Sequence, residues 1–273
     1  MDRNLLSGNF SNIEAKIEIA RDLIREQNFV QARKFLSELV KLSSKNPEIN
    51  YLLGQLYEID ADYKNAAKCY ANLLAYDLSY ELKTRLSQCF LDAEEYDLAY
   101  DLFRDLYDNN TQDVSIIEQF AHTARIMGKP GEAVAAYNKI LHLDKNNIIA
   151  LTQLAEIYYD AQDKMNHYLV KAKLNYIQNM FSSSVDCFKR ALSYSKEDDE
   201  IVSILMNLAK VLAEAGKYEE AIDQYLFVLN LDPQNEIAQT QVELLHDKLA
   251  EKDYEEPSST TWFEKLFIYL NII

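Results

Sequence analysis

A hydrophobic pattern that repeats about every 34 residues runs through most of the chain. Each copy has two stretches in which apolar residues recur three and four positions apart, and this spacing places them on one face of an α-helix. The clearest copy contains Leu208, Ala209, Leu212, Gly216, Tyr218, Ala221, Tyr225 and Pro233. A period of this length predicts one helix–turn–helix unit per copy, and such a unit buries its apolar face only against neighbouring units.

The residue that opens the second helix of each copy marks the register of the pattern. These marks are Phe29, Tyr63, Tyr96, Pro130, Phe181 and Tyr218, at steps of 34, 33, 34, 51 and 37 residues. Three positions after each mark stands a small residue: Ala32, Ala66, Ala99, Ala133, Ser184 and Ala221. Four positions later stands a large one: Leu36, Tyr70, Phe103, Tyr137, Phe188 and Tyr225. Because a small residue lets two helix backbones approach and a large one fills the space beside it, we expect closely packed hairpins.

The step of 51 residues leaves room for one extra helix between the fourth and fifth copies. In one arrangement, a helix over 148–164 has no partner and residues 165–198 form the next unit. In the other, residues 166–178 form a second helix, with Ala172 and Tyr176 as its small and large residues. Either arrangement leaves one helix unpaired, and we assign the unpaired helix to residues 148–164.

These copies resemble the pattern of tetratricopeptide repeat (TPR) proteins, which reads apolar-x-x-apolar-small-x-x-Tyr and then Gly-Asp/Lys-Tyr, Ala, Tyr/Phe, Ala and Pro. The resemblance covers about four-fifths of the chain. It implies an all-α fold, an α-solenoid of helix–turn–helix units that forms a right-handed superhelix and binds other proteins. The expected organisation is a lead-in over 1–12, four units over 13–147, an unpaired helix over 148–164, two units over 165–235, a capping helix over 236–252, and a linker with an apolar segment over 253–273.

The resemblance also implies where a partner binds, because ligands of the family lie along the concave side of the first helices. Residues carried over to that surface are Arg21, Arg25, Tyr51, Gln55, Arg85, Gln88, Gln119, His122, Arg125 and Tyr159. The Lys/Asn/Arg set with which some TPR domains clamp a C-terminal carboxylate is missing, since Ile17 and Arg21 stand where its Lys and Asn would be. The arginines pair either with an acidic peptide or with neighbouring acids in a solvated charge mosaic, which the sequence favours. The neighbouring acids are Glu18, Glu58, Asp92 and Glu118.

The last twelve residues, 262–273, are far more apolar than the stretch before them and contain the only tryptophan. Trp262 and Phe263 begin a stripe at helical spacing, and both are counted among the expected partner-binding residues. Twelve residues are too few to span a bilayer. The segment therefore folds back as a cap, docks into a partner or lies in a membrane interface, and its acidic flanks weigh against the last of these.

Composition narrows the choice of partner and compartment. With 44 Asp and Glu against 28 Lys and Arg, the chain carries a net charge of −16, which repels phosphate backbones, so we expect no nucleic-acid partner. Three cysteines without CxxC spacing suit reduced thiols. Because the N-terminus also lacks the apolar core of a signal peptide, we expect a cytoplasmic protein.

No spacing typical of catalysis or of a cofactor site stands out. The four histidines are far apart, and Gly128 and Gly131 belong to a turn rather than to a phosphate-binding loop. We therefore expect no enzyme, no metal and no cofactor. The predicted function is a scaffold or adaptor that binds a peptide or helix of a partner protein. The alternative is a membrane-proximal assembly factor tethered by the apolar C-terminal segment.

Overall fold

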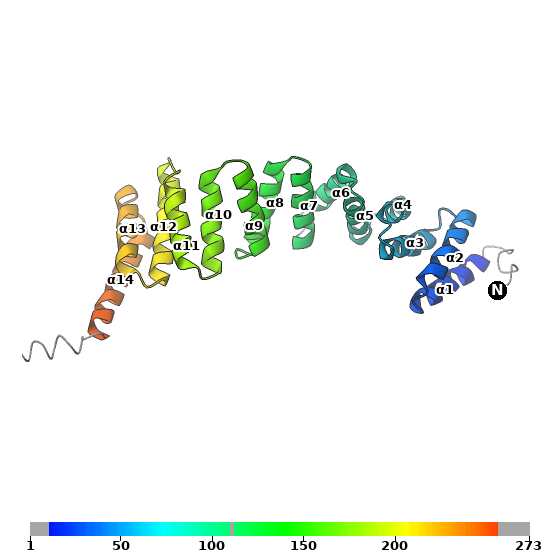
Figure 1. Cartoon of the computed structure of the whole chain (residues 1–273), viewed down its shortest axis with the longest axis horizontal. Helices are drawn as coiled ribbons and strands as arrows, with labels where there is room; N and C mark the ends of the chain where they lie inside the picture. Colours follow the sequence, from blue (N-terminus) through cyan, green and yellow to red (C-terminus); the bar gives the residue numbers. More distant parts are fainter. Residues whose placement is uncertain (1–10, 110–111, 256–273) are drawn as a thin grey trace, which may run out of the picture. The chain divides into compact units, whose positions relative to one another are not determined.

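The computed structural model describes residues 11–109 and 112–255, and these residues form fourteen α-helices and no strand. The chain divides into two compact units, Met1–Leu143 and Asp144–Ile273, here called unit 1 and unit 2. Within each unit, consecutive helices lie side by side as hairpins (Figure 1). The all-α helical repeat fold expected from the sequence is therefore confirmed.

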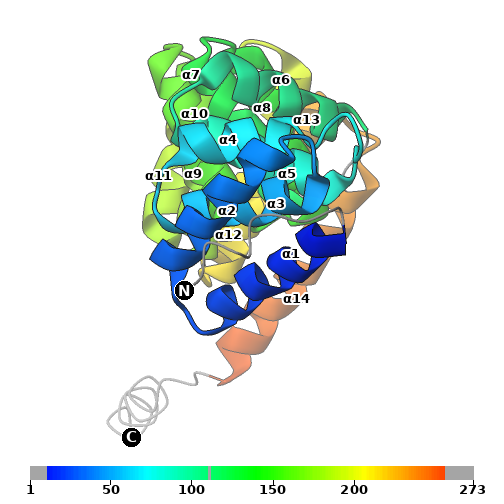
Figure 2. The same cartoon turned by 90° about the vertical axis from the view of Figure 1, so that its right-hand side faces the viewer.

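Unit 1 contains four helical hairpins. Its helices are α1 (Ser11–Arg25), α2 (Phe29–Leu42), α3 (Pro47–Ile59), α4 (Tyr63–Ala71), α5 (Tyr80–Asp92), α6 (Tyr96–Asp108), α7 (Val114–Ile126) and α8 (Pro130–Leu143). In Figure 2, α1 and α2 lie at the front as two helices joined by a short turn. Each second helix begins at a register mark read from the sequence, including α8, which begins at Pro130, where proline is tolerated in a first turn.

Unit 2 contains the remaining six described helices. They are α9 (Ile148–Asp160), α10 (Lys164–Ile177), α11 (Phe181–Leu192), α12 (Asp198–Glu214), α13 (Tyr218–Leu231) and α14 (Glu236–Glu255). The helix α14 packs against α13 at the place expected for a capping helix. The predicted linker and apolar segment lie almost wholly outside the described residues.

Side-chain caps explain where several helices begin. In six of them, the side-chain oxygen of the capping residue accepts a hydrogen bond from the backbone N–H three residues on, which satisfies a donor that the helix leaves unpaired. The six capping residues are Asn46, Asp62, Ser79, Asn147, Asp163 and Asn235. Each of these residues stands directly before the first residue of its helix.

The core of the hairpins follows the alternation of small and large residues. All six small positions after the register marks are fully buried, and the six large ones are exposed by 3% at most. Gly54 shows how close the contact becomes, because a Cβ atom at this position would lie 2.6 Å from Cε1 of Tyr70. The Tyr70 ring therefore occupies the space that any larger residue at position 54 would need.

The turn inside each hairpin has one residue in the left-handed region. These residues are Gln27, Ala61, Glu94, Gly128, Gln162, Asn179 and Gly216. Just after each of them the chain closes a hydrogen bond back across the helix end, as between the Asp62 N–H and the Tyr57 carbonyl at 2.8 Å. The turns follow one another at 33 or 34 residues, except that Gln162 and Asn179 are only 17 residues apart and Asn179 and Gly216 are 37 apart.

The short interval shows that α10 belongs to two hairpins at once. His167 Nδ1 lies 2.8 Å from the Ala155 carbonyl of α9, and Ser184 Oγ of α11 donates to the Ala172 carbonyl of α10 at 2.8 Å. Both pairs are 12 residues apart in sequence, which is also the separation of the small residues Gly54 and Ala66.

The helix α10 is therefore the second helix of a hairpin with α9 and the first helix of a hairpin with α11. This differs from the unpaired helix expected over 148–164, since α9 packs against α10 along its length. The expectation assigned each helix to one hairpin only. A helix with apolar or small residues on two faces can pack on both sides, and α10 has Ala172 on one face and His167 on another.

Candidate functional site

The first helices of unit 1 carry most of the residues expected to bind a partner. Arg21 on α1 pairs with Glu18 at 2.9 Å and also with Glu48 on α3, which ties two neighbouring hairpins together. Arg25 pairs with Glu18 at 3.4 Å and with Asp22 at 2.7 Å. Because all these side chains are substantially exposed, water screens each pair, and its contribution to stability is small.

A tighter group of side chains, here called the Glu58 cluster, joins α3, α4 and α5. It consists of Tyr51, Glu58, Tyr70, Arg85 and Cys89. Glu58 Oε2 accepts hydrogen bonds from Tyr70 Oη and from Arg85 Nη1, both at 2.8 Å. The Arg85 guanidinium carbon lies 5.9 Å from the centre of the Tyr51 ring, and the Tyr51 and Tyr70 ring centres are 6.1 Å apart. The cluster therefore holds an aromatic ring and an arginine in fixed positions on two consecutive first helices.

Burial and the Glu58 carboxylate control the protonation of this cluster. Burial, together with the nearby Glu58 carboxylate, raises the pKa of the Cys89 thiol to about 12. The same two causes hold the pKa of the Tyr70 hydroxyl well above its usual range. Both groups therefore keep their protons near neutral pH, so Cys89 is a poor nucleophile and Tyr70 remains a hydrogen-bond donor.

The other expected residues of unit 1 are placed on the first helices but do not join this cluster. Gln88 on α5 donates to Asp92 at 2.9 Å, and His122 on α7 is exposed. Gln55, Gln119 and Arg125 are half-buried. The pairings that a charge mosaic requires are present for Arg21 and Arg25 with Glu18 and for Arg85 with Glu58. Trp262 and Phe263 lie outside the described residues.

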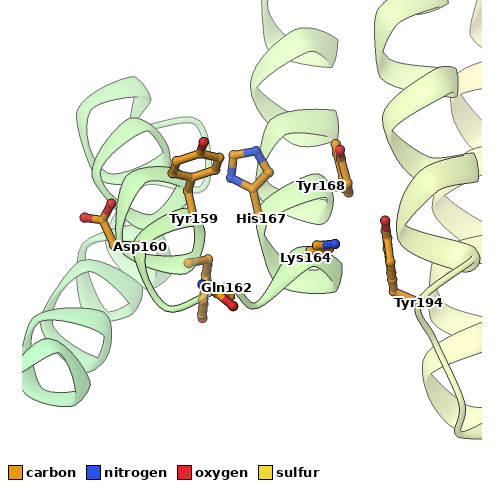
Figure 3. Close-up of a pocket in the computed structure, with 8 residues that line it drawn as sticks. Tyr159, Asp160, Gln162, Lys164, His167, Tyr168 and Tyr194 are labelled. Atoms are coloured by element: carbon orange, nitrogen blue, oxygen red, sulfur yellow. The ribbon is translucent and has the colours of Figure 1, made fainter.

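Tyr159, the expected residue of unit 2, lies in a pocket that the sequence analysis missed. The pocket encloses about 500 Å³ at the ends of α9, α10 and α11 (Figure 3). Its lining, here called the tyrosine pocket, consists of Tyr158, Tyr159, Asp160, Gln162, Lys164, His167, Tyr168 and Tyr194. The feature of the sequence that points to this pocket is His167, which stands where the six other hairpins have alanine or serine.

The rings of the tyrosine pocket form a continuous series. The His167 ring lies between Tyr159, at 5.4 Å between ring centres, and Tyr168, at 5.3 Å (Figure 3). Tyr168 and Tyr194 are nearly parallel, with an interplanar angle of 8° and centres 6.1 Å apart. Because a carbonyl oxygen only accepts, the close contact with Ala155 assigns the proton to Nδ1 of His167 and fixes the orientation of its ring.

A second hollow of about 600 Å³ lies among α12, α13 and α14. Its lining includes Met206, Tyr218 and Leu244, together with Ile237, which is 65% exposed. Over the described residues, no group of three His, Cys, Asp or Glu side chains is arranged to hold a metal ion. None of the helices α1 to α14 is long and apolar enough to cross a membrane.

Comparison with known proteins finds two stretches of the chain that match one repeat family. A sequence model of the tetratricopeptide repeat family matches residues 60–114 and 171–236. A curated relative, the TPR repeat-containing protein MJ1428 of Methanocaldococcus jannaschii, is 24% identical over 258 residues. The match covers 93% of this chain and 38% of the relative, so the chain spans less than half of that protein.

A solved structure has a similar fold. A MamA fragment from Desulfovibrio magneticus RS-1 superimposes with a TM-score of 0.51 at 16% identity, over 63% of this chain and 96% of the fragment. A tetratricopeptide repeat protein from Parabacteroides merdae gives a TM-score of 0.48 at 13% identity, over 86% of this chain and 98% of that one. At this level of identity the first similarity concerns the fold alone.

Proposed function

We propose that this chain, two stretches of which match the tetratricopeptide repeat family, serves as a scaffold on which a segment of another protein lies across the first helices of the hairpins. The observation that carries the proposal is the Glu58 cluster. Tyrosine and arginine are the residue types that contribute most to protein interfaces, and here Tyr51 and Arg85 are held together on neighbouring first helices.

Preorganisation gives the cluster its value for binding. Free arginine and tyrosine side chains lose rotamer entropy when a partner immobilises them, roughly 0.5–1.5 kcal/mol for each side chain. The bonds from Arg85 and Tyr70 to Glu58 fix part of this geometry before a partner arrives. A helix or an extended segment of the partner then meets a surface that needs little ordering.

The test begins with purification of the chain from its source cells and identification of the proteins bound to it. Binding of a purified partner is then measured for a double variant, Gln88→Arg with His122→Arg, which places large side chains on the first helices α5 and α7. We expect the affinity to fall at least tenfold, because the new side chains occupy the partner's place.

A matched control keeps the same two substitutions but moves them to second helices. Gln31→Arg with His142→Arg changes exposed residues of α2 and α8 and adds the same charge. An equal loss of affinity in the two double variants would show that the first helices are not the binding surface. Arg85→Glu is less informative, because it places a second carboxylate beside Glu58 and weakens the fold as well.

The tethered alternative rests on the apolar sequence of residues 262–273. Flotation of the full chain and of a variant shortened at residue 257 with vesicles of neutral and anionic lipid tests it directly. Flotation of the full chain alone supports a membrane contact through this segment, whereas flotation of neither form counts against it.

A further inference from the structure

We propose that the tyrosine pocket binds a positively charged side chain of the partner protein, with a guanidinium or a methylated ammonium as its head group. The inference deepens the proposed scaffold function and rests on it, since the cation is taken to belong to a bound protein segment. It assigns a second contact point in unit 2, apart from the Glu58 cluster of unit 1.

The pocket originates from the double role of α10. In its hairpin with α9, His167 occupies the position that a small residue occupies in the other hairpins, and its ring extends to the Ala155 carbonyl. In its hairpin with α11, the same helix presents Tyr168 to Tyr194. The two sets of rings meet at one end of the three helices, and the space between them is the pocket in Figure 3.

The chemistry of the lining favours a cation. The faces of tyrosine rings carry partial negative charge, and they attract a cation most strongly where several rings surround it. Tyr159 presents a ring that is 70% exposed, and His167 and Tyr168 continue the wall behind it. Asp160 adds a carboxylate to the same lining, and the chain as a whole carries a net charge of −16.

The chain already places its own cations on these rings. Lys164 Nζ lies 5.5 Å from the centre of the Tyr194 ring, and the Arg190 guanidinium carbon lies 5.5 Å from the centre of the Tyr168 ring. Arg190 also donates to the Tyr168 hydroxyl at 3.4 Å. These contacts show that the rings accept ammonium and guanidinium groups. Lys164 is exposed, so a cation from a partner can take its place on Tyr194.

The test is a titration of the isotopically labelled full chain, followed by NMR, with peptides of the form acetyl-Gly-X-Gly-amide. The residue X is arginine, trimethyllysine, lysine, norleucine or glutamate. We expect the arginine or the trimethyllysine peptide to shift the amide signals of residues 158–168 and 194 with the highest affinity, and the better of the two identifies the head group. The proposal fails if the norleucine or glutamate peptide binds as well as both of these, or if neither shifts these signals at 20 mM.

Three variants sharpen the test. Tyr159→Leu should weaken binding of the better cationic peptide about fivefold, since it removes one ring. Asp160→Asn should weaken it about two- to threefold, because it removes a nearby negative charge. Lys164→Met should strengthen it about two- to fivefold, because the competing ammonium is gone. Weaker binding by Lys164→Met would contradict a cationic ligand.

Tyr76→Leu is the matched control for the loss of an exposed ring, because Tyr76 is 58% exposed and lies in unit 1. It should leave the titration unchanged, and an equal loss of affinity would overturn the assignment to the tyrosine pocket. The outcome is separate from that of the scaffold function. If no cationic peptide binds the tyrosine pocket while the double variant Gln88→Arg with His122→Arg still lowers the affinity for the partner protein, the cation site is refuted and the scaffold function stands.

Discussion

At the scale of single residues, the packing of Gly54 against Tyr70 is the most demanding contact. A Cβ atom at position 54 would lie 2.6 Å from the Tyr70 ring, far inside the normal contact distance. The ring has little freedom to move, because its hydroxyl is bonded to Glu58 at 2.8 Å and its side chain is fully buried. Glycine at this position therefore follows from close approach rather than from backbone flexibility.

We expect Gly54→Ala to lower the free energy of unfolding by about 1–3 kcal/mol through overpacking, although alanine favours a helix. The control is Gly131→Ala, since a Cβ atom at this helical position meets nothing within 4 Å. That change should be neutral or stabilise the protein by up to about 1 kcal/mol. Urea unfolding followed by circular dichroism measures both variants, and equal midpoints would refute the steric argument.

The cysteines provide a second prediction at this scale. Burial raises the pKa of Cys69 to about 11 and that of Cys89 to about 12, whereas Cys187 is only partly buried. Near pH 8 we expect a thiol reagent to modify Cys187 first and to reach Cys69 and Cys89 only in urea. Rapid modification of all three thiols without urea would contradict the described packing.

The raised pKa values of Cys69 and Cys89 also predict how the free energy of unfolding changes with pH. A thiol whose pKa is higher in the folded state than in the unfolded state contributes stability that is complete below the unfolded value, near 9. This stability is lost as the pH rises through 9 toward 11 and 12. The free energy of unfolding should therefore fall over this range, and it should fall less steeply in Cys89→Ala, measured by urea unfolding at each pH.

At the scale of the helices and turns, five of the seven hairpin turns hold a non-glycine residue in the left-handed region. An L-residue in this conformation costs about 1–2 kcal/mol, so these turns carry strain that glycine would remove. Ala61, with a φ of 57°, is the simplest case because its methyl group is exposed. The tight turn, rather than its residue type, sets the register of the hairpin.

We expect Ala61→Gly to raise the free energy of unfolding by about 0.5–1 kcal/mol, because relief of strain exceeds the added entropy of the unfolded chain. The same substitution at Ala15, an exposed position within α1, should lower it by about 0.5–1 kcal/mol. The two substitutions should change the free energy of unfolding in opposite directions, as measured by thermal or urea unfolding. A loss of stability in both variants would mean that the turn is not strained.

The helices also show how far sequence alone leads. The period, the register marks and the small and large positions could be read from the chain, because steric packing imposes them in every hairpin. The double role of α10 could not, since His167 replaces the small residue expected in the hairpin with α9, and the repeat pattern assigns each helix to one hairpin only. The tyrosine pocket depends on ring orientations from three helices, which no spacing rule specifies.

At the scale of the whole molecule, a repeat array is stabilised mainly by contacts between neighbouring helices. Damage to one hairpin should therefore remain local. In hydrogen exchange measured by mass spectrometry, we expect Gly54→Ala to speed exchange in α3, α4 and α5 and to leave α12 and α13 unchanged. Faster exchange throughout both units would instead show that the chain unfolds as one cooperative body.

The shared helix α10 has a consequence for how such a chain can lengthen. Between Gln162 and Asn179 the array advances by 17 residues, half of its usual step, with the same type of turn on both sides. A protein of this kind can therefore gain or lose a single helix and still pack all its helices against one another. The condition is that the helix at that point offers a small residue to each neighbour. After such a half-step, first and second helices exchange places in the alternation of the array. The side that first helices form before the step is then formed by second helices after it.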